Sequence, residues 1–445
     1  MDVARGLGAR HHLFLRDRRP RDPAGIQGHD ALRGGAGRAR RAARAADPGR
    51  GATGHRQSGQ AGLHGRGRGE RPDRPSRACR LPGSCRSHGP TPVHADRRAA
   101  GRSRLETAGV RFGLGLSVQH LPEEPQAVRF REHVEQVRLA RAVGFSSVWA
   151  SQHYLSDPFT YFQPIPTLAR LAADARGLIL GTGVLLLPLL HPVDVAEQLA
   201  TLDVITDGRL VVGVGLGYRD IENRAFGHDP KDRVDRFVES LEVVERLWSG
   251  EPVDYEGRYF NLRSTRISMR PMQSPRPPVW LAANGDAGVR RAARLGDAWL
   301  MNPHATLATL ERQLELFRST RRELGRSPAV ETPLIKECYV APDAATALAE
   351  AAAFIGPKYT AYRRWEQDKA LPAGESFDAS FGELARDRFI IGDPARVVDE
   401  IARYRERLGV TTMIFRLQWP GMDQEKVLRS IRLLGQKVLL KFLSS

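Results

Sequence analysis

The chain has 445 residues and a formal net charge of +17, but residues 1–108 contain 24 arginines, no lysine and nine acidic residues, which account for +15 of that charge. Residues 109–445 hold 44 basic and 42 acidic side chains, so the charge balance gives no reason to expect a nucleic-acid-binding surface on the main body. No apolar run approaches the roughly eighteen residues of a membrane span, and Cys79, Cys85 and Cys338 lack the spacing of a disulfide framework or a metal site.

Residues 1–108 have the composition of a segment that cannot fold. They contain one aromatic residue, Phe14, of the 31 in the chain and no sustained apolar periodicity, so we expect a disordered segment outside the native fold. Three interpretations stay open: an RNA-binding arm, a targeting peptide, or residues upstream of the true start that derive from a GC-rich leader. Composition favours the third, with Val110 as the natural initiator if its codon is GTG.

The other two interpretations lack a second signal. No aromatic residues alternate with the arginines to stack on bases. No apolar stretch of about seven residues follows Arg16, Arg18 and Arg19, as a signal peptide requires. Nucleic-acid binding through this segment is therefore the weaker functional hypothesis, and we expect a cytoplasmic protein with no membrane partner.

Residues 109–445 alternate between short β-branched or leucine-rich runs and segments of helical periodicity, which indicates one large α/β domain. In chain order, strands are predicted over residues 112–118, 147–150, 178–187, 210–214, 279–282, 298–301, 334–340 and 412–417. Helices are predicted over residues 126–143, 164–175, a segment that begins at 192, 234–248, 287–295, 307–324, 395–408 and 425–440.

These eight alternations predict a TIM barrel, in which parallel strands close into a ring surrounded by helices. Residues 249–278 and 357–393 do not fit a repeating unit, and we expect both as insertions over the carboxyl-terminal mouth. A doubly wound open sheet is the alternative, but its dinucleotide fingerprint is missing. Gly213, Gly215 and Gly217 match that fingerprint weakly, and they fit close packing at a barrel mouth equally well.

Unusual residues follow four predicted strands, at the end where TIM barrels carry their active sites. The segments are 151–154, 181–184, 215–218 and 283–286. His153 is either a structural hydrogen-bonding residue or a functional one. The loop at Asn284 and Gly285 either binds a phosphate through its backbone N–H groups or is an ordinary helix cap, with Asn284 or Asp286 at the N-cap. Composition alone favours the cap.

Short motifs occur in a set order along the body. They are Phe112-Gly113-Leu114, Gly181-Thr182-Gly183-Val184, His191-Pro192, Gly208-Arg209-Leu210, Gly213-Val214-Gly215-Leu216-Gly217-Tyr218, Leu247-Trp248-Ser249-Gly250, Pro277-Pro278-Val279-Trp280 and Gly392-Asp393-Pro394. This series of motifs resembles the bacterial luciferase-like superfamily of flavin and deazaflavin enzymes. The resemblance lies in the order and spacing of the motifs and not in any single motif.

The resemblance implies a TIM barrel with a reduced flavin or deazaflavin across the strand ends, and usually a homodimer. Gly183-Val184 matches a position on the third strand where the family often has a non-prolyl cis peptide that supports the ring. The loop at Asn284 and Gly285 matches the phosphate-contacting loop. Positions against the cofactor are matched by Leu216, Gly217 and Tyr218.

His153 matches an active-site histidine of the family that exchanges a proton near the flavin or with the substrate. We also assign its neighbour Gln152 to cofactor binding. One branch, the deazaflavin-dependent sugar-phosphate dehydrogenases, carries acidic residues where this chain has Gln152 and Tyr218. The resemblance therefore argues against that specific activity.

The leading hypothesis is a two-component monooxygenase that uses reduced FMN and dioxygen to oxidise a small organic substrate, with a separate flavin reductase as partner. The alternative is hydride transfer with an 8-hydroxy-5-deazaflavin coenzyme, which needs the same cradle but no dioxygen. Residues 249–278 and 357–393 are candidate lids that exclude water. The identity of the substrate depends on pocket side chains whose arrangement the sequence does not reveal.

Overall fold

The structure is a computed structural model that describes residues 109–372 and 375–442. The expectations for residues 1–108, including those for Cys79 and Cys85, fall outside the described residues, so the proposed division of the chain at residue 108 stays a prediction. Within the described ranges, no helix combines the length and the apolar character that crossing a membrane needs.

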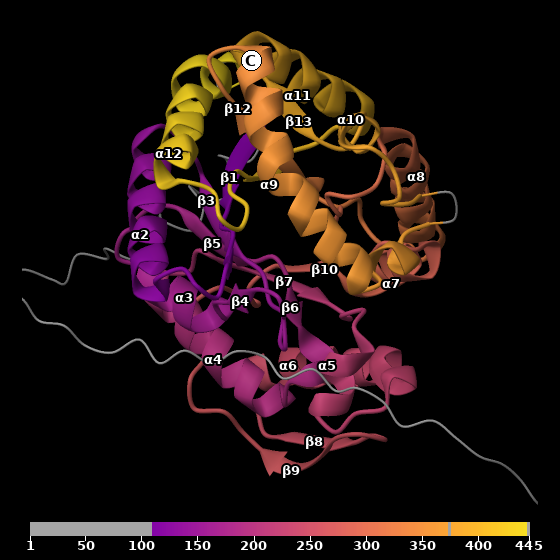
Figure 1. Cartoon of the computed structure of the whole chain (residues 1–445). Helices are drawn as coiled ribbons and strands as arrows, with labels where there is room; N and C mark the ends of the chain where they lie inside the picture. Colours follow the sequence, from indigo (N-terminus) through magenta and orange to yellow (C-terminus); the bar gives the residue numbers. More distant parts are fainter. Residues whose placement is uncertain (1–108, 373–374, 443–445) are drawn as a thin grey trace, which may run out of the picture. The chain divides into compact units, whose positions relative to one another are not determined.

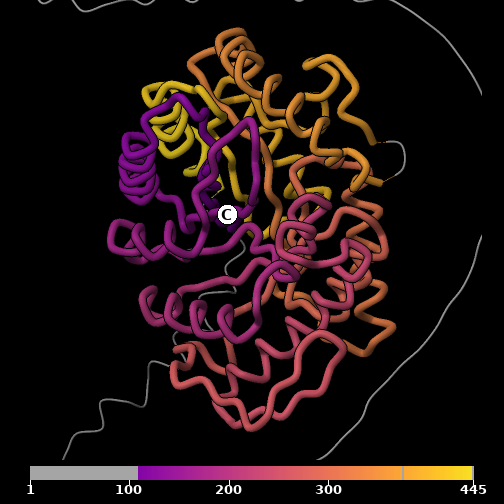
Figure 2. The backbone as a smooth tube through the Cα atoms, turned by 60° about the horizontal axis from the view of Figure 1, so that its bottom comes forward, coloured from indigo at the N-terminus to yellow at the C-terminus, as the bar shows by residue number. Residues whose placement is uncertain are grey.

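Eight parallel strands form a closed ring, in the eight places that the sequence predicts (Figures 1 and 2). The strand predicted over residues 178–187 is shorter than expected, because it ends at Thr182 and the chain resumes as the separate short strand β6 (Leu185–Leu186). In ring order they are β1 (Arg111–Gly115), β3 (Ser147–Ala150), β5 (Ile179–Thr182), β7 (Leu210–Gly215), β10 (Val279–Ala282), β11 (Ala298–Leu300), β12 (Pro333–Val340) and β14 (Thr412–Arg416). β14 pairs with β1, and a bridge between Met301 and Leu334 joins β11 to β12 and closes the ring. The predicted TIM barrel is confirmed.

Helices follow the strands and pack around the ring. They are α2 (Gln126–Ala142), α3 (Pro164–Leu171), α4 (Pro192–Ile205), α6 (Arg233–Trp248), α7 (Asp286–Leu295), α8 (Leu307–Glu323), α11 (Pro394–Leu408) and α12 (Gln424–Leu433), the last continued by a π-turn and a 3-10 turn over 434–441. α11 shows why such segments are helical. Asp393 caps its start, Pro394 occupies its first turn, and Gly409 ends it in the left-handed region.

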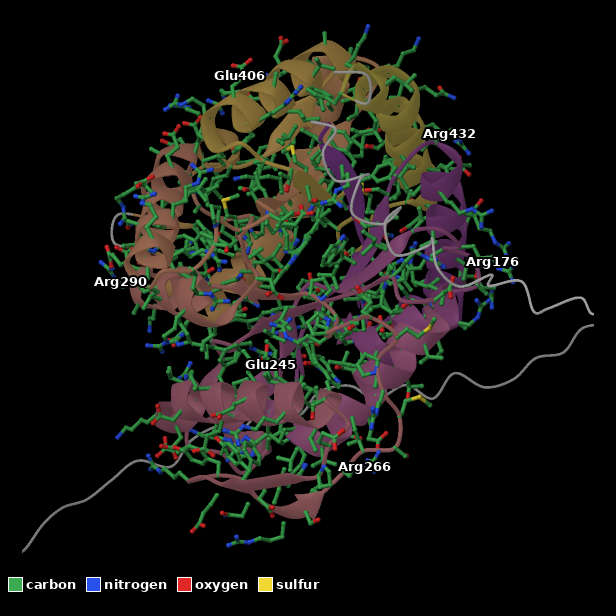
Figure 3. The ribbon with its side chains drawn as sticks, turned by 180° about the vertical axis from the view of Figure 1, so that it is seen from behind. Arg176, Glu245, Arg266, Arg290, Glu406 and Arg432 are labelled. Carbon is green, nitrogen blue, oxygen red and sulfur yellow. The ribbon has the colours of Figure 1, made fainter. Side chains whose placement is uncertain are left out.

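Helices such as α11 are amphipathic, and their exposed charged side chains lie on the face directed away from the barrel. On α11, Val397, Ile401, Tyr404 and Leu408 are buried, as the sequence predicts, whereas Glu406 is exposed. Figure 3 shows Glu406, Arg432 and Arg290 directed outward from three different helices. Burial of one apolar stripe per helix against the ring is the main stabilising contribution in this arrangement.

The interior of the ring is filled by its own cluster of apolar side chains. Its members are Trp149, Val211, Trp280, Ala298, Leu300, Ile335 and Ile414. The rings of Trp149 and Trp280 stack with their centroids 5.0 Å apart. Gly181 leaves the space that Trp149 occupies, because a Cβ there would collide with the indole. This cluster fills the middle of the ring.

Gly213 supports the packing interpretation of the glycine series on β7. A Cβ added at Gly213 would collide with the backbone oxygen of Thr182 on β5, which cannot move aside as a flexible side chain can. We expect Gly213→Ala to lower the free energy of unfolding by about 1 to 3 kcal/mol or more. Urea denaturation measures this, with Gly382→Ala as the control because its added Cβ meets nothing within 4 Å. Equal stability of the two variants would contradict the interpretation.

Smaller elements extend the loops of the barrel. At the rim are β2 (Gln119–His120), which pairs with β4 (Thr160–Tyr161), then β6 (Leu185–Leu186) and the short helix α5 (Asp220–Ala225). Between β12 and α11 the chain forms α9 (Ala344–Arg364), a 3-10 turn (Gln367–Ala370), α10 (Phe381–Ala385) and β13 (Ile390–Gly392). Pro357, the first residue of the predicted insertion, lies inside α9, so the excursion begins earlier in the chain than the sequence predicts.

The prediction that residues 249–278 lie over the mouth is wrong. This segment forms a hairpin of β8 (Val253–Glu256) and β9 (Asn261–Thr265). The backbone N–H groups of Arg258 and Tyr259 at its tip donate to Glu239 of α6, at 2.9 and 3.0 Å. The segment leaves the end of α6 and enters β10 at its amino end, so its connection runs on the side of the ring away from the mouth.

Candidate active site

A cavity of about 390 Å³ lies at the carboxyl-terminal rim of the ring. Its volume is in the range of small-molecule sites. Nine predicted site residues from four strand ends line it together: Gln152, His153, Gly183, Val184, Leu216, Gly217, Tyr218, Asn284 and Gly285. His153 and Gly285 follow strands that are three positions apart around the ring, yet both border this one space.

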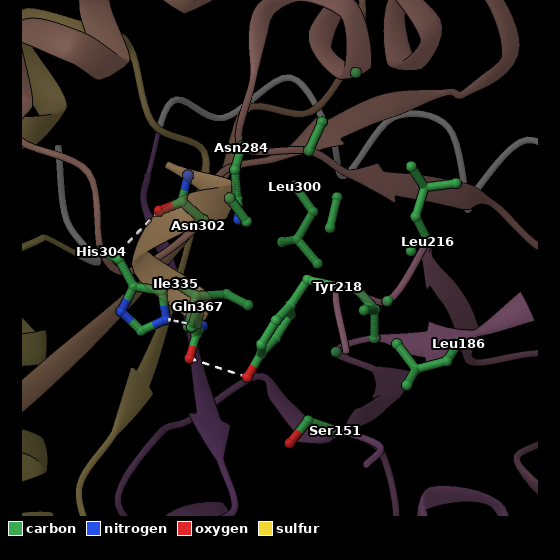
Figure 4. Close-up of a pocket in the computed structure, with 18 of the residues that line it drawn as sticks. Ser151, Leu186, Leu216, Tyr218, Asn284, Leu300, Asn302, His304, Ile335 and Gln367 are labelled. Carbon is green, nitrogen blue, oxygen red and sulfur yellow. Dashed lines mark hydrogen bonds between the residues drawn. The ribbon is translucent and has the colours of Figure 1, made fainter. Parts of the chain in front are cut away.

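One wall of the cavity consists of apolar and glycine residues from β5, β7, β10 and β11. The peptide bond between Gly183 and Val184 is cis, as the resemblance implies. The absence of a side chain at Gly215 allows Val184 to pack directly against β7, because a Cβ at Gly215 would lie only 2.8 Å from Val184 Cγ2. Figure 4 shows Leu186 and Leu216 together on one side of the cavity and Leu300 closer to its middle. This surface suits a flat, apolar ring system.

The amino end of α7 opens onto the cavity without a side-chain cap. Gly285 is the N-cap residue, which corrects the prediction of Asn284 or Asp286 in that role. The Asp286 carboxylate instead accepts from Arg312, at 2.7 and 2.9 Å, outside the cavity wall. A Cβ added at Gly285 would meet nothing within 4 Å. The first-turn N–H groups of α7 are therefore available to an anion.

Arg291, one turn further along α7, also lines the cavity. It makes no hydrogen bond or ion pair with any of the residues that the structure describes. Burial, followed by the charge of Arg294, lowers the pKa of its guanidinium from the ordinary value. A bound anion would offset both effects, so Arg291 and the uncapped helix end form a site suited to a phosphate.

His153 is held by a buried carboxylate. Its Nδ1 lies 2.9 Å from Oε1 of Glu222, a residue of α5 whose side chain is fully buried. The same oxygen accepts from the Tyr154 backbone N–H at 2.9 Å. With Nδ1–H donated to Glu222, the other ring nitrogen, Nε2, is left as the group that can exchange a proton.

The loop that carries His153 is fixed from behind by Arg219. The guanidinium donates to the backbone oxygens of Tyr154 and Leu155, at 2.7 and 2.9 Å. It also lies 4.3 Å from the centroid of the Trp365 ring. The rings of Tyr161, Tyr218 and Trp365 pack around the imidazole, with centroids 5.5 to 5.7 Å away. His153 is therefore held in one orientation in a largely apolar surrounding.

Gln152 lines the cavity, but its side chain forms hydrogen bonds that join three neighbouring segments of the protein. Its Nε2 donates to the Tyr154 hydroxyl at 2.9 Å and to Gln163 Oε1 at 3.1 Å, and its Oε1 accepts from the Leu186 backbone N–H at 2.8 Å. Both N–H donors are engaged within the protein. A contact with a cofactor through Gln152 would therefore rest on its remaining acceptor capacity alone.

A hydrogen-bond chain crosses the cavity from β7 to β11 (Figure 4). The Tyr218 hydroxyl donates to Gln367 Oε1 at 3.3 Å, and Gln367 Nε2 lies 2.8 Å from His304 Nε2. Burial, and then the charge of Arg416, lowers the pKa of His304 well below its usual range. His304 is therefore neutral, accepts from Gln367 at Nε2, and donates from Nδ1 to the Tyr359 hydroxyl at 2.9 Å.

This chain ties the excursion after β12 to the cavity. Gln367, Tyr362 and Ala370, all within the predicted insertion 357–393, line the space. The prediction that this insertion lies over the mouth is confirmed, in contrast to that for residues 249–278. Its action as a lid stays a prediction.

The comparisons with known proteins agree with this geometry. The model of a family described as luciferase-like monooxygenase matches residues 110–412. The chain belongs to the luciferase-like monooxygenase family. It is thus an oxidoreductase. The relatives of this luciferase-like enzyme include proteins named for dependence on F420 and proteins named for dependence on a flavin.

A curated relative, the F420-dependent glucose-6-phosphate dehydrogenase of Microbacterium testaceum, is 30% identical over 311 residues, which are 68% of this chain and 90% of that protein. The oxygenase component of flavin-dependent trigonelline monooxygenase from Acinetobacter baylyi is 25% identical over 350 residues, 76% of this chain and 96% of that protein. The crystal structure of monooxygenase RslO1 from Streptomyces bottropensis aligns with a TM-score of 0.66 and 28% identity, over 75% of this chain and 100% of that one.

The residues at the rim of this luciferase-like enzyme fit a flavin-type cofactor. The apolar wall at Gly183 and Val184 can face a ring, and the open space at Gly285 leads to the uncapped end of α7. A buried donor also lacks a partner among the described residues, the Nδ2 of Asn302 on the cavity wall. A buried donor without an acceptor is costly, and a polar ring edge could satisfy it.

The sequence analysis missed several site residues: Glu222, Arg291, Asn302, His304, Gln367 and Arg416. Arg291 had a usable signal, because it lies one turn after a predicted phosphate loop. Glu222 had none, since it sits in a six-residue helix of a loop that the sequence leaves without structure. Arg416 ends β14, and the period-two alternation of that strand places it on the same face as buried Ile414.

Proposed function

We propose that this protein is an FMN-dependent monooxygenase, which uses reduced FMN and dioxygen to oxidise a small organic substrate. The observation that supports this most is the joint placement of two features around one cavity. One is the uncapped amino end of α7 with Arg291 beside it, and the other is the pair of His153 and Glu222, in which Nδ1 and Oε1 lie 2.9 Å apart.

The proposed roles of the residues follow from their positions. The backbone at Gly285 and the guanidinium of Arg291 hold the phosphate, and Gly183 and Val184 support one face of the ring system. When bound, reduced FMN supplies two electrons to dioxygen, so that one oxygen atom enters the substrate and the other leaves as water. Leu216 and Tyr218 close the cavity beside it and exclude bulk water.

His153 has the proposed role of proton exchange with the reacting molecules. Its Nε2 carries no hydrogen bond to the described residues, whereas Nδ1 is fixed by Glu222. Glu222 is a positioning residue, because it acts on the substrate only through the orientation and tautomer of the imidazole. The aromatic rings around His153 keep competing water away.

Hydride transfer with an 8-hydroxy-5-deazaflavin coenzyme is the second candidate. It is favoured by the 30% identity to a dehydrogenase named for F420 dependence, over 90% of that relative. Against it stands the resemblance argument that this branch has acidic residues where this chain has Gln152 and Tyr218. In the structure neither position supplies a negative charge, and Tyr218 donates to Gln367.

Anaerobic titration of the purified protein with reduced FMN and with the reduced deazaflavin, followed by admission of air, tests the choice. We expect saturable binding of reduced FMN and oxidation of the bound cofactor by air, with spectra distinct from those of free flavin. Tight binding of the deazaflavin with no preference for reduced FMN would overturn the proposal in favour of the second candidate.

Arg291→Met provides a residue-level test of the phosphate site. We expect the dissociation constant for FMN to rise at least about tenfold, equivalent to about 1.4 kcal/mol, because a charge-assisted hydrogen bond is lost. The affinity for riboflavin, which has no phosphate, should change little. Fluorescence titration measures both, with Arg294→Met, an exposed arginine on the same helix, as the matched control. Equal loss of FMN and riboflavin affinity would remove Arg291 from the phosphate site.

The partners are also part of the proposal. A separate flavin reductase is supported by the relative named as an oxygenase component. A homodimer follows from the family resemblance and awaits measurement of the mass in solution. The third hypothesis, nucleic-acid binding, rests on residues 1–108, which lie outside the described part of the chain.

A further inference from the structure

Arg416 places a positively charged side chain at the rim of the barrel. The proposed cofactor site does not assign a role to this charge. It is the last residue of β14, and its side chain faces the inside of the ring, two residues beyond the buried Ile414. Its stem packs against β1, since a Cβ added at Gly115 would lie 3.2 Å from Arg416 Cγ. The side chain is 18% exposed and lines the cavity.

The guanidinium of Arg416 has no hydrogen-bond partner among the described residues. Its contact with a carboxylate is a distance of 3.7 Å from Nη1 to Glu337 Oε1, which is too long for a hydrogen bond. A guanidinium carries five N–H donors in a planar fork. These donors face the cavity and are not used by the described residues, so the arrangement is typical of a group that binds a ligand.

The carboxylate nearest to Arg416 is already neutralised. Glu337 Oε1 accepts from Lys358 Nζ of α9 at 2.7 Å, and Oε2 accepts from Trp419 Nε1 at 2.7 Å. Both Lys358 and Glu337 are buried. Because one carboxylate faces two cations, this cluster carries a net positive charge of one, and the cation that opens onto the cavity is Arg416.

The position of Arg416 separates it from the phosphate site. In the ring, β14 is three strands away from β10, whose loop leads to the uncapped end of α7. Around Arg416, the cavity wall is formed by Tyr161 and Tyr362, and both rings lie in the electrostatic surroundings of the guanidinium. This half of the rim therefore combines one fixed cation with flat aromatic surfaces.

We propose that Arg416 binds a carboxylate of the substrate, so that this enzyme acts on small aromatic or short-chain carboxylic acids. A single planar guanidinium matches a single carboxylate in a bidentate pair, and one negative charge balances the excess charge of the cluster. The tyrosine rings contact the rest of the substrate. The inference rests on the proposed function for the reaction, but the binding preference that it predicts is independent of the cofactor.

Calorimetric titration with carboxylic acids and their amides tests this directly. The probes are benzoate, phenylacetate and hexanoate, each compared with the corresponding neutral amide, with and without FMN. We expect at least one acid to bind the wild-type protein about tenfold or more tightly than its amide. Arg416→Met should reduce that ratio to about one, and Arg416→Lys should keep part of it because the charge remains while the planar fork is lost.

Arg291→Met is the matched control, since it removes the other arginine that lines the cavity. It should weaken FMN binding and leave the preference for acids over amides unchanged, while Arg416→Met should do the reverse. No preference for any of the three acids at millimolar concentration, or a preference that survives Arg416→Met, would overturn the proposal. So would a loss of FMN affinity in Arg416→Met as large as that in Arg291→Met. A protein that prefers acids but binds no FMN would sink the proposed function and leave this inference standing.

Discussion

Replacement of His153 by alanine is expected to lower turnover by a factor of about 100 to 10,000, the range that general acid–base catalysis supplies. The affinity for FMN should stay within a few-fold of wild type, because the imidazole is proposed to exchange a proton in the reacting complex and not to hold the cofactor. Steady-state oxygen consumption and FMN fluorescence titration measure the two effects separately.

Glu222→Gln is the companion variant. It keeps the shape of the side chain and its contact with the Tyr154 backbone, but it removes the charge that fixes Nδ1–H of His153. We expect an intermediate loss of turnover and a changed pH profile, with little change in FMN affinity. If His153→Ala instead lowered thermal stability and FMN affinity together while its residual turnover stayed near wild type, His153 would be a structural residue.

Replacement of Lys336 by methionine is expected to change how stability depends on pH. Lys336 lies on β12, fully buried, and its ammonium donates to the Ala305 backbone oxygen at 3.1 Å and sits 4.8 Å from the Tyr404 ring centroid. Burial, followed by the charge of Arg388, lowers its pKa from 10.5 to about 7, against a smaller raising effect of Glu375. The charged form is therefore disfavoured in the folded protein.

The sign of the effect follows from proton binding. Between about pH 7 and pH 10.5 the unfolded chain keeps the proton on Lys336 whereas the folded protein has released it, so this residue makes stability rise with pH across that window. Lys336→Met removes the dependence. Relative to wild type, the variant should be most stabilised at and below pH 7, on the order of a few kcal/mol, and the advantage should shrink toward pH 10.

Urea unfolding at pH 6, 7, 8.5 and 10 measures this difference, and Lys437→Met, at an exposed position, is the control. The charged or titrating groups near Lys336 are His304, Glu375, Asp387, Arg388, Arg403 and Tyr404. They are present in both proteins, so the comparison isolates Lys336 together with its coupling to them. A difference between wild type and Lys336→Met that does not vary with pH would contradict the account.

The sequence was sufficient for the barrel because each strand and helix carries its own local signal. Residues 394–408 illustrate this, since the Asp393 cap, Pro394, the stripe from Val397 to Leu408 and Gly409 all specify one helix. The hairpin at 249–278 was misplaced for a topological reason. It follows a helix and not a strand, so it connects at the amino-terminal side of the ring, and composition does not reveal that difference.

The residues proposed to contact the cofactor were predictable because they belong to short sequence motifs at the ends of strands. Gly183-Val184, Leu216-Gly217 and Asn284-Gly285 follow strand ends directly, and all of them line the cavity. Glu222 and Arg416 were not predictable in the same way. Their importance depends on which side chains they meet in the fold. Glu222 meets His153, 69 positions away in the sequence, and Arg416 lines the cavity together with Tyr161 and Tyr362.

A crystal structure of the protein with FMN tests the central claim most directly, namely that the carboxyl-terminal rim of the barrel is a flavin site. The account predicts the phosphate within hydrogen-bonding distance of the first-turn N–H groups of α7 and of Arg291, with the ring system against Gly183 and Val184 and His153 beside it. FMN bound outside this cavity, or with its phosphate directed to Arg416, would contradict it.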